Sequence, residues 1–198
     1  MSTISARLQR QFEFLVEIDK LKTVERQNII TGESGRRENS AEHSWHVAML
    51  AIILSEYSDK PIEIAKVVKM LLVHDLVEID AGDVFVHRAD EQRAQREREG
   101  QAAKRLFAIL PEDQAEDLMD CWLEFEACAT PEAKFAKALD RVQPVLMHGA
   151  TDAVAWERHR TTKNQVIAQT KGVRENTPAL WEKVRGVIDA AADKGRLC

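Results

Sequence analysis

Apolar residues recur along most of this chain at intervals of three and four positions, the period of a helix that buries one face. The first such segment predicts a helix whose apolar face carries Leu8, Phe12, Leu15 and Val16. Similar stripes predict further helices around residues 47–54, 64–72, 106–110, 118–122, 135–146 and 181–188. We find no alternating run of strand length, no internal repeat and no linker. The pattern therefore predicts an all-α helical bundle that forms a single domain over residues 1–198.

Capping residues, prolines and a glycine predict where several helices begin and end. Asn39, with Glu42 three positions later, has the sequence of a capping box at a helix start. Pro61 suits the first turn of a helix that Gly82 would end. Two Thr-Pro pairs predict further helix starts; they are Thr130-Pro131 and Thr177-Pro178. Between the first two helices, residues 24–39 are polar and predict a long loop, which in a compact domain is more often functional than idle.

Composition narrows the possible functions. The 198 residues are 44% hydrophobic, enough for one sizeable core, and carry a net charge of −5. That charge argues against a nucleic-acid polymer or a membrane surface as partner. The first residues lack the apolar core of a signal peptide, and no apolar stretch approaches membrane-spanning length. The three cysteines show no close-spaced pair, so we expect reduced thiols and a cytoplasmic protein.

Four side chains point to a metal site. The dipeptide His74-Asp75 lies inside the apolar run 69–77, where either residue would be costly to bury unpaired. His43 lies four residues before Val47, on the core side of its predicted helix, and Asp140 lies on a later helix. Two imidazoles and two carboxylates suit one divalent cation, either Mn²⁺, Co²⁺, Fe²⁺, Zn²⁺ or Mg²⁺, with coordination positions left open for water. The alternative is that both histidines are ordinary hydrogen-bonded core residues.

Several segments around these residues resemble those of the HD-domain metal-dependent phosphohydrolases, and their sequences are most similar to those of the 5'-deoxynucleotidases of that group. The segments are residues 38–44 (ENSAEHS), residues 72–78 (LVHDLVE) with Gly82-Asp83 after them, and residues 131–140 (PEAKFAKALD). The resemblance covers about residues 21–143. It implies an HD core over about residues 21–150, followed by C-terminal helices over residues 151–198. It also implies that His43, His74, Asp75 and Asp140 bind the metal.

The resemblance further implies that Glu78 and Asp83 serve the chemistry and that Arg26 contacts the substrate. Glu78 lies three residues after Asp75, so a shared helix face would let its carboxylate orient a water or take its proton. Arg36 and Arg37 are further candidates for substrate binding, because a guanidinium group offers two donors to a phosphate. The alternative for each of these residues is a solvated surface position.

One position departs from the nucleotidases that the chain resembles. They carry a tryptophan directly after the arginine, where this chain has Gln27, so a preference for deoxyribose is an open question. Two other histidines are weaker candidates: His46, three residues after His43, for supporting the ligands or packing in the core, and His87, beyond Gly82, for lining the cleft.

The function that the resemblance implies is a phosphomonoesterase that releases phosphate from (deoxy)nucleoside 5'-monophosphates. Two alternatives stay open: a phosphodiesterase or signalling-nucleotide hydrolase on the same fold, and a non-catalytic regulatory module stapled by the metal. Glu78 and Asp83 argue against the module, because a staple needs neither. The apolar, tryptophan-containing helix surfaces, together with the resemblance, predict a homodimer.

Overall fold

The computed structural model describes residues 5–32, 35–83 and 89–198, and most of them are helical, which confirms the all-α prediction. The first half of the chain forms α1 (Ala6–Ile18), η1 (Asp19–Thr23), β1 (Glu25–Ile29), β2 (Arg37–Asn39), α2 (Ser40–Leu54), η2 (Ser55–Tyr57), α3 (Ile64–Val73) and α4 (Glu78–Ala81). The second half forms α5 (Ala89–Phe107), α6 (Glu112–Ala127), α7 (Pro131–Ala150), α8 (Val154–Arg158), α9 (Lys163–Gln169), α10 (Lys171–Asn176) and α11 (Pro178–Asp193). Among these described helices, none is long and apolar enough to cross a membrane.

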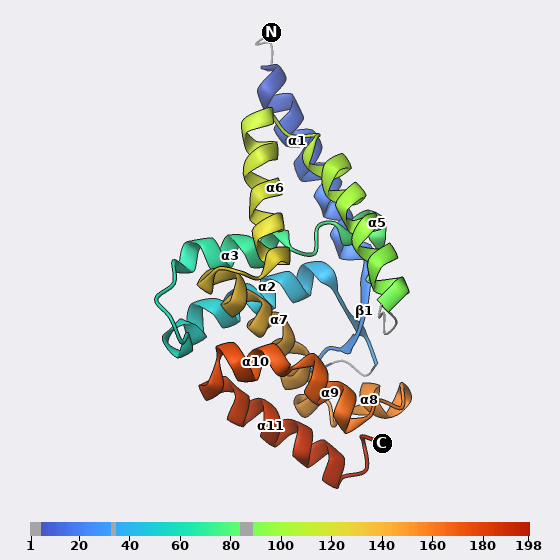
Figure 1. Cartoon of the computed structure of the whole chain (residues 1–198). Helices are drawn as coiled ribbons and strands as arrows, with labels where there is room; N and C mark the ends of the chain where they lie inside the picture. Colours follow the sequence, from blue (N-terminus) through green and yellow to red (C-terminus); the bar gives the residue numbers. More distant parts are fainter. Residues whose placement is uncertain (1–4, 33–34, 84–88) are drawn as a thin grey trace.

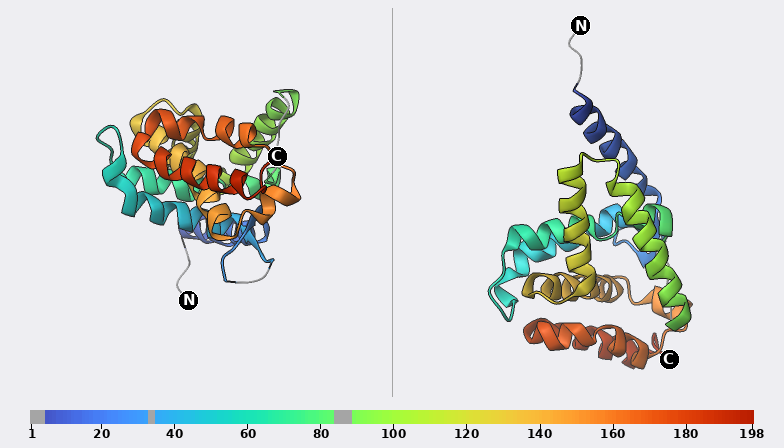
Figure 2. Two further views of the ribbon diagram at one scale, coloured as in Figure 1. Left: turned by 90° about the horizontal axis from the view of Figure 1, so that it is seen from below. Right: turned by 45° about the horizontal axis from the view of Figure 1, so that its top comes forward.

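Helix α7 is the centre of the body. It packs against α2 and α3 on one side and against α10 and α11 on the other, as Figures 1 and 2 show. Its inward residues Phe135 and Leu139 are buried together with Val47 of α2 and Val67 and Leu71 of α3. Because this core fixes α2, α3 and α7 relative to one another, polar side chains on their inner faces are held in place as well.

The predicted loop over residues 24–39 contains a small β-hairpin, which the sequence pattern did not predict. Strands β1 and β2 are antiparallel, with Glu25 opposite Asn39 and Ile29 opposite Arg37. The backbone N–H of Ser40 donates to the carbonyl of Val24 at 2.9 Å, which ties the hairpin to the start of α2. The strands are short and mostly polar, so backbone pairing stabilises them and the hydrophobic pattern carries no signal.

The apolar face predicted for α1 is present, but the expectation that this face is buried in the core is wrong. Leu8, Phe12, Leu15 and Val16 are between 41% and 72% exposed, and Phe14 is the buried residue of this helix. Helix α1 extends from the body beside α5 and α6 (Figure 1). Periodicity shows that one face of a helix is apolar, but it does not show what covers that face.

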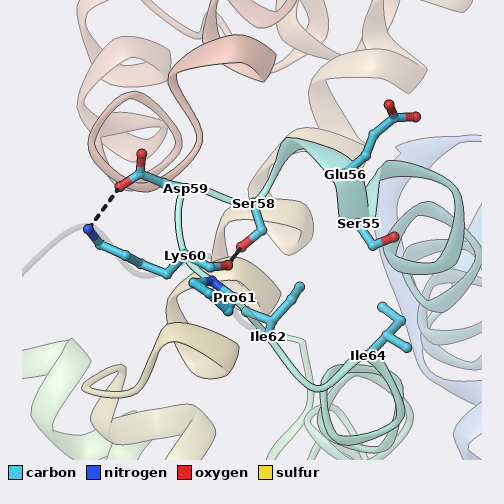
Figure 3. Close-up of a pocket in the computed structure, with 8 residues that line it drawn as sticks. All are labelled: Ser55, Glu56, Ser58, Asp59, Lys60, Pro61, Ile62 and Ile64. Atoms are coloured by element: carbon cyan, nitrogen blue, oxygen red, sulfur yellow. Dashed lines mark hydrogen bonds and ion pairs between the residues drawn. The ribbon is translucent and has the colours of Figure 1, made fainter.

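The connection between α2 and α3 also differs from the prediction. Helix α3 begins at Ile64, three residues after Pro61, and its N-cap is Glu63. The segment before it is a turn in which the Ser58 hydroxyl donates to the carbonyl of Lys60 at 2.7 Å (Figure 3). This turn borders a surface pocket that none of the candidate site residues lines. A proline is compatible with a helix start, but it is equally compatible with a loop.

The predicted helix caps are mostly confirmed. Asn39 and Glu42 form a reciprocal capping box at the start of α2, with bonds of 3.0 and 3.1 Å. The Thr130 hydroxyl accepts from the backbone N–H of Ala133 at the start of α7. Helix α11 begins at Pro178 as predicted, but the hydroxyl of Thr177 donates backwards to the carbonyl of Val173, so it does not cap the helix.

His148 gives the fold a specific pH dependence. Its ring stacks on Trp156 at 4.2 Å between centroids and is 7% exposed, and burial, with a smaller effect of the His159 charge, lowers its pKa to about 4. The unfolded chain takes up a proton on the His148 ring near pH 6.5 while the folded chain does not, so the free energy of unfolding falls as the pH drops.

Between pH 7 and 5, we expect wild type to lose about 2 kcal/mol more unfolding free energy than His148→Phe. Urea unfolding at both pH values measures this, and equal losses would contradict it.

Candidate metal centre

Three neighbouring elements bring the four predicted ligands together. His43 lies on α2 and is fully buried, while His74 and Asp75 directly follow α3 and are also buried. Asp140 lies on α7, next to the fully buried Leu139. Packing of α2, α3 and α7 in the core therefore places both imidazoles and both carboxylates at one point.

The chain around His74 and Asp75 is a turn and does not form the continuous helix predicted to Gly82. Helix α3 ends at Val73, and tight backbone bonds such as Glu78 N–H to the carbonyl of Asp75, at 2.9 Å, lead into α4. Gly82 ends α4 as predicted, with a φ of 73° that favours glycine. The apolar run made a helix the natural expectation, whereas the turn lets the adjacent His74 and Asp75 face the same point.

The candidate ligand atoms are spaced as ligands around one ion are. One ligand atom from each of His43, His74 and Asp75 lies within 4.8 Å of the others. Asp140 Oδ1 lies 3.0 Å from His43 Nε2 and 3.6 Å from His74 Nε2. Asp75 closes the group, because its Oδ1 lies 3.0 Å from His74 Nε2 and its Oδ2 lies 3.9 Å from His43 Nε2. Zinc–nitrogen and zinc–oxygen bonds of about 2.0–2.2 Å are compatible with such separations.

The ring of His74 supports the fit to a metal independently. Its Nδ1 lies 2.8 Å from the carbonyl oxygen of Leu71, which can only accept, so Nδ1 carries the proton and Nε2 offers a lone pair. That Nε2 is buried and makes no hydrogen bond within the described residues. The ring also packs on Phe125, at 4.9 Å between centroids. A buried nitrogen lone pair without a donor, facing two carboxylates, is the environment that a cation would complete.

The electrostatics of the cluster also favour a cation. Burial alone would raise the pKa of Asp140, but the charge of Arg141, the hydrogen bond from His43 and the nearby His74 hold it well below its usual range. The pKa of His43 rises to about 9: burial and Arg26 act to lower it, and the carboxylates of Asp140, Glu38 and Asp75 outweigh them. A proton and a metal compete for the same nitrogen, so metal binding would release a proton here.

Glu78 and Asp83 lie beside the ligands. The Ser40 hydroxyl donates to Glu78 Oε2 at 2.6 Å, and Glu78 Oε1 lies 3.7 Å from Arg26 Nη1. Burial and the charge of Asp75 raise the pKa of Glu78 to about 9, against the effect of Arg26. Burial likewise raises the pKa of Asp83, whose carboxyl feels the charges of Arg26 and Asp75. Both carboxyl groups therefore lie near the cluster, one on α4 and one just after it.

Among the three candidate arginines, Arg26 is placed in the cluster. It is largely buried, its Nη1 donates to Asp75 Oδ2 at 2.9 Å, and its Nε lies 3.9 Å from Glu38 Oε2 but makes no hydrogen bond within the described residues. Arg36 instead pairs with Glu42 at 2.9 Å, and Arg37 pairs with Glu25 at 3.3 Å. Substrate binding by Arg36 and Arg37 stays a prediction, and His87 lies outside the described residues.

Sequence reasoning missed the polar residues that support His43. Gln143 is fully buried on α7, and Glu38 is buried on β2; both contact each other and lie beside the His43 ring. Gln143 follows Asp140 by three positions, so both lie on one face of the helix, and this spacing was the available signal. Glu38 is the first residue of segment 38–44, which carries part of the family resemblance, and this position was the available signal for it.

Comparison with known proteins agrees with this arrangement. A family model described as HD domain matches residues 18–181. A crystal structure of a predicted metal-dependent phosphohydrolase from Magnetospirillum magnetotacticum is 45% identical, with a TM-score of 0.90, over 98% of this chain and 96% of that one.

Two named relatives are similar over a shorter stretch. The 5'-deoxynucleotidase HDDC2 of Bos taurus is 30% identical over 147 residues, which span 74% of this chain and 70% of that protein. The Homo sapiens protein of the same name is 30% identical over 134 residues, 68% of this chain and 64% of that protein. The ordered His43, His74-Asp75 and Asp140 on a helical bundle, together with the family match, show that the chain belongs to the HD domain family.

Proposed function

We propose that this protein is a metal-dependent phosphomonoesterase that releases phosphate from nucleoside 5'-monophosphates. The observation that carries the proposal is the convergence of His43, His74, Asp75 and Asp140, with Glu78 and Arg26 beside them. The relatives named 5'-deoxynucleotidase support the choice of substrate. A divalent ion would supply Lewis acidity at a phosphate oxygen, and the donor set suits Mn²⁺, Co²⁺, Fe²⁺, Zn²⁺ or Mg²⁺.

The residues around the ligands have separate tasks in this proposal. Glu78, whose carboxyl a bound cation would keep ionised, orients the attacking water and accepts its proton, and the Ser40 hydroxyl holds the carboxyl in place. Arg26 neutralises charge on the phosphate with its planar donors, including the Nε, which makes no hydrogen bond within the described residues. Asp83 would either assist Glu78 with this water or meet the leaving oxygen. Spontaneous hydrolysis of phosphate monoesters is extremely slow, so this electrostatic clamping has to lower most of the barrier.

The sugar preference of the enzyme depends on the position after Arg26. Gln27 accepts a hydrogen bond from Arg37 across the hairpin, and its flexible amide gives no evident reason to reject a 2'-hydroxyl. We therefore propose a preference for deoxyribonucleotides over ribonucleotides of less than about 100-fold in kcat/KM, which corresponds to about 2.7 kcal/mol.

Phosphate release from a nucleotide panel tests the proposed function. The protein is stripped with a chelator, each of the five metals is restored in turn, and matched pairs such as dAMP and AMP are compared with cyclic and hyperphosphorylated nucleotides. We expect metal-restored release from 5'-monophosphates. Turnover of only diesters or hyperphosphorylated nucleotides would overturn the choice of substrate, and no turnover of any compound with metal bound would indicate a regulatory module.

We also propose that the chain forms one domain over residues 1–198 and is cytoplasmic. The packing of α7 against both α2–α3 and α10–α11 supports a single unit, since the C-terminal helices share the core of the rest. The three unpaired thiols, Cys121, Cys128 and Cys198, support a reducing compartment.

A homodimer is the assembly we propose, supported by two exposed apolar faces. Phe12 on α1 is 54% exposed and Ile53 on α2 is 63% exposed. The exposed apolar residues of each helix follow the spacing i, i+4, i+7 and i+8 of one helix face; they are Leu8, Phe12, Leu15 and Val16 on α1, and Trp45, Met49, Ile52 and Ile53 on α2. We expect wild type to sediment at about twice its chain mass of 22.4 kDa. The double variant Phe12→Glu/Ile53→Glu should sediment as a monomer, whereas the exposed control Lys60→Glu should not change. A monomeric wild type would contradict the dimer.

A further inference from the structure

Gln143 of α7 makes a set of contacts that the chemistry proposed above does not use. Its Oε1 lies 3.1 Å from His43 Nδ1, on the side of the ring opposite the ligand cluster. Its Nε2 lies 2.6 Å from Glu38 Oε1 and 3.1 Å from His46 Nδ1. The side chain is fully buried, so its amide depends on these three partners.

The partners determine which way the amide of Gln143 points. An ionised carboxylate can only accept hydrogen bonds, so the Glu38 side must receive the amide N–H group. The second N–H then meets His46 Nδ1, and the amide oxygen must face His43. A reversed amide would place two acceptors against each other at 2.6 Å, so Glu38 removes the ambiguity that glutamine orientation usually carries.

This orientation fixes the proton on His43. Because the facing atom of Gln143 is an acceptor, Nδ1 of His43 must donate, and Nε2 is the nitrogen left to face Asp140 at 3.0 Å. His74 reaches the same state by donating Nδ1–H to the backbone carbonyl of Leu71. His43 has a side-chain amide in the place of that carbonyl, so its orientation depends on the sequence at position 143.

We propose that Gln143, itself oriented by Glu38, is a positioning residue that holds the His43 ring with Nε2 toward the metal. The inference rests on the metal centre of the proposed function and adds a residue pair outside the ligand set. Partners that hold the other nitrogen of a metal-binding histidine typically contribute about 10 to 100-fold in metal affinity. The cost of losing Gln143 should therefore appear in metal binding itself, before any turnover is measured.

The test measures the dissociation constant for Zn²⁺ by competition with a chromophoric chelator, on the full chain. Gln143→Met keeps the length of the side chain but removes its acceptor, and we expect Zn²⁺ affinity to fall about 10 to 100-fold. Gln114→Met is the matched control, because it makes the same exchange at a glutamine whose amide contacts Gln11 and lies outside this network; its affinity should stay within about threefold of wild type. Thermal unfolding of each metal-free variant shows whether the fold is kept.

An exchange of the two partners separates positioning from packing. Gln143→Glu alone would place a second carboxylate against Glu38 and should weaken Zn²⁺ binding or the fold. The double variant Glu38→Gln/Gln143→Glu restores a donor facing an acceptor at that contact and still offers His43 Nδ1 an acceptor, so it should bind Zn²⁺ more tightly than Gln143→Glu and Gln143→Met.

The outcomes distinguish this inference from the proposed function. Wild-type Zn²⁺ affinity in a folded Gln143→Met protein would overturn the positioning role while leaving the metal centre intact. A double variant that binds no better than Gln143→Glu, although folded, would also overturn it. If wild type itself bound no Zn²⁺ or any of the other four ions, the metal centre of the proposed function would fail instead.

Discussion

Replacement of His74 by Ala or of Asp75 by Asn is expected to lower the metal content and to lower phosphate release by more than about 1,000-fold, the equivalent of several kcal/mol of transition-state stabilisation. His74→Ala deletes one ligand atom, and Asp75→Asn replaces a charged carboxylate by a weaker, neutral amide, in a group in which His74 Nε2 and Asp75 Oδ1 lie 3.0 Å apart. We choose Asn at position 75 because it keeps the shape of Asp75 beside the buried Arg26. Elemental analysis of the purified variants measures the metal, and phosphate release measures the activity.

Two surface substitutions serve as matched controls for this experiment. Asp80→Asn changes a residue of α4, five positions after Asp75. The carboxylate of Asp80 pairs with Arg105 and makes no contact with the cluster among the described residues. His159→Ala removes an exposed imidazole. Both proteins should keep their metal and activity. Full metal occupancy in both His74→Ala and Asp75→Asn would show that the site is wrongly assigned.

Glu78→Gln should separate chemistry from metal binding. The carboxylate contacts Ser40 and Arg26, and no close contact joins it to a ligand histidine among the described residues, so the amide should leave the ion in place. We expect kcat to fall by about 100 to 10,000-fold, because an amide cannot accept the proton of the attacking water. Metal affinity should weaken by at most about 10 to 100-fold.

Turnover of Glu78→Gln and of wild type is compared at saturating metal concentration. Ser40→Ala is a useful companion, since it removes the hydrogen bond to Glu78 and keeps the carboxylate, and its loss of turnover should be much smaller. Near wild-type turnover of Glu78→Gln with the metal site full would exclude Glu78 as the group that orients the water.

The parts of the structure that the sequence predicted are those with strong local signals. The capping box at Asn39 and the helix start at Thr130 follow from side chains that bond the nearest backbone groups. His43 was placed on the core face of its helix by its distance from Val47, and both are fully buried. Local chemistry of this kind does not depend on distant parts of the chain.

The parts that the sequence could not predict depend on partners far along the chain. The break after Val73 interrupts an apolar run whose period continues through it, so the pattern favoured an unbroken helix. The exposure of Phe12 depends on what packs over α1, which periodicity does not specify. Gln143 and Glu38 are 105 positions apart, and a buried amide–carboxylate pair leaves no periodic mark.

Anomalous diffraction at the zinc edge, from crystals grown with Zn²⁺, locates the bound ion. We expect one strong peak per chain, about 2.0–2.2 Å from His43 Nε2, His74 Nε2 and a carboxylate oxygen of each of Asp75 and Asp140. A peak coordinated by other residues would contradict this site, as would an empty cluster in crystals of protein that releases phosphate with Zn²⁺.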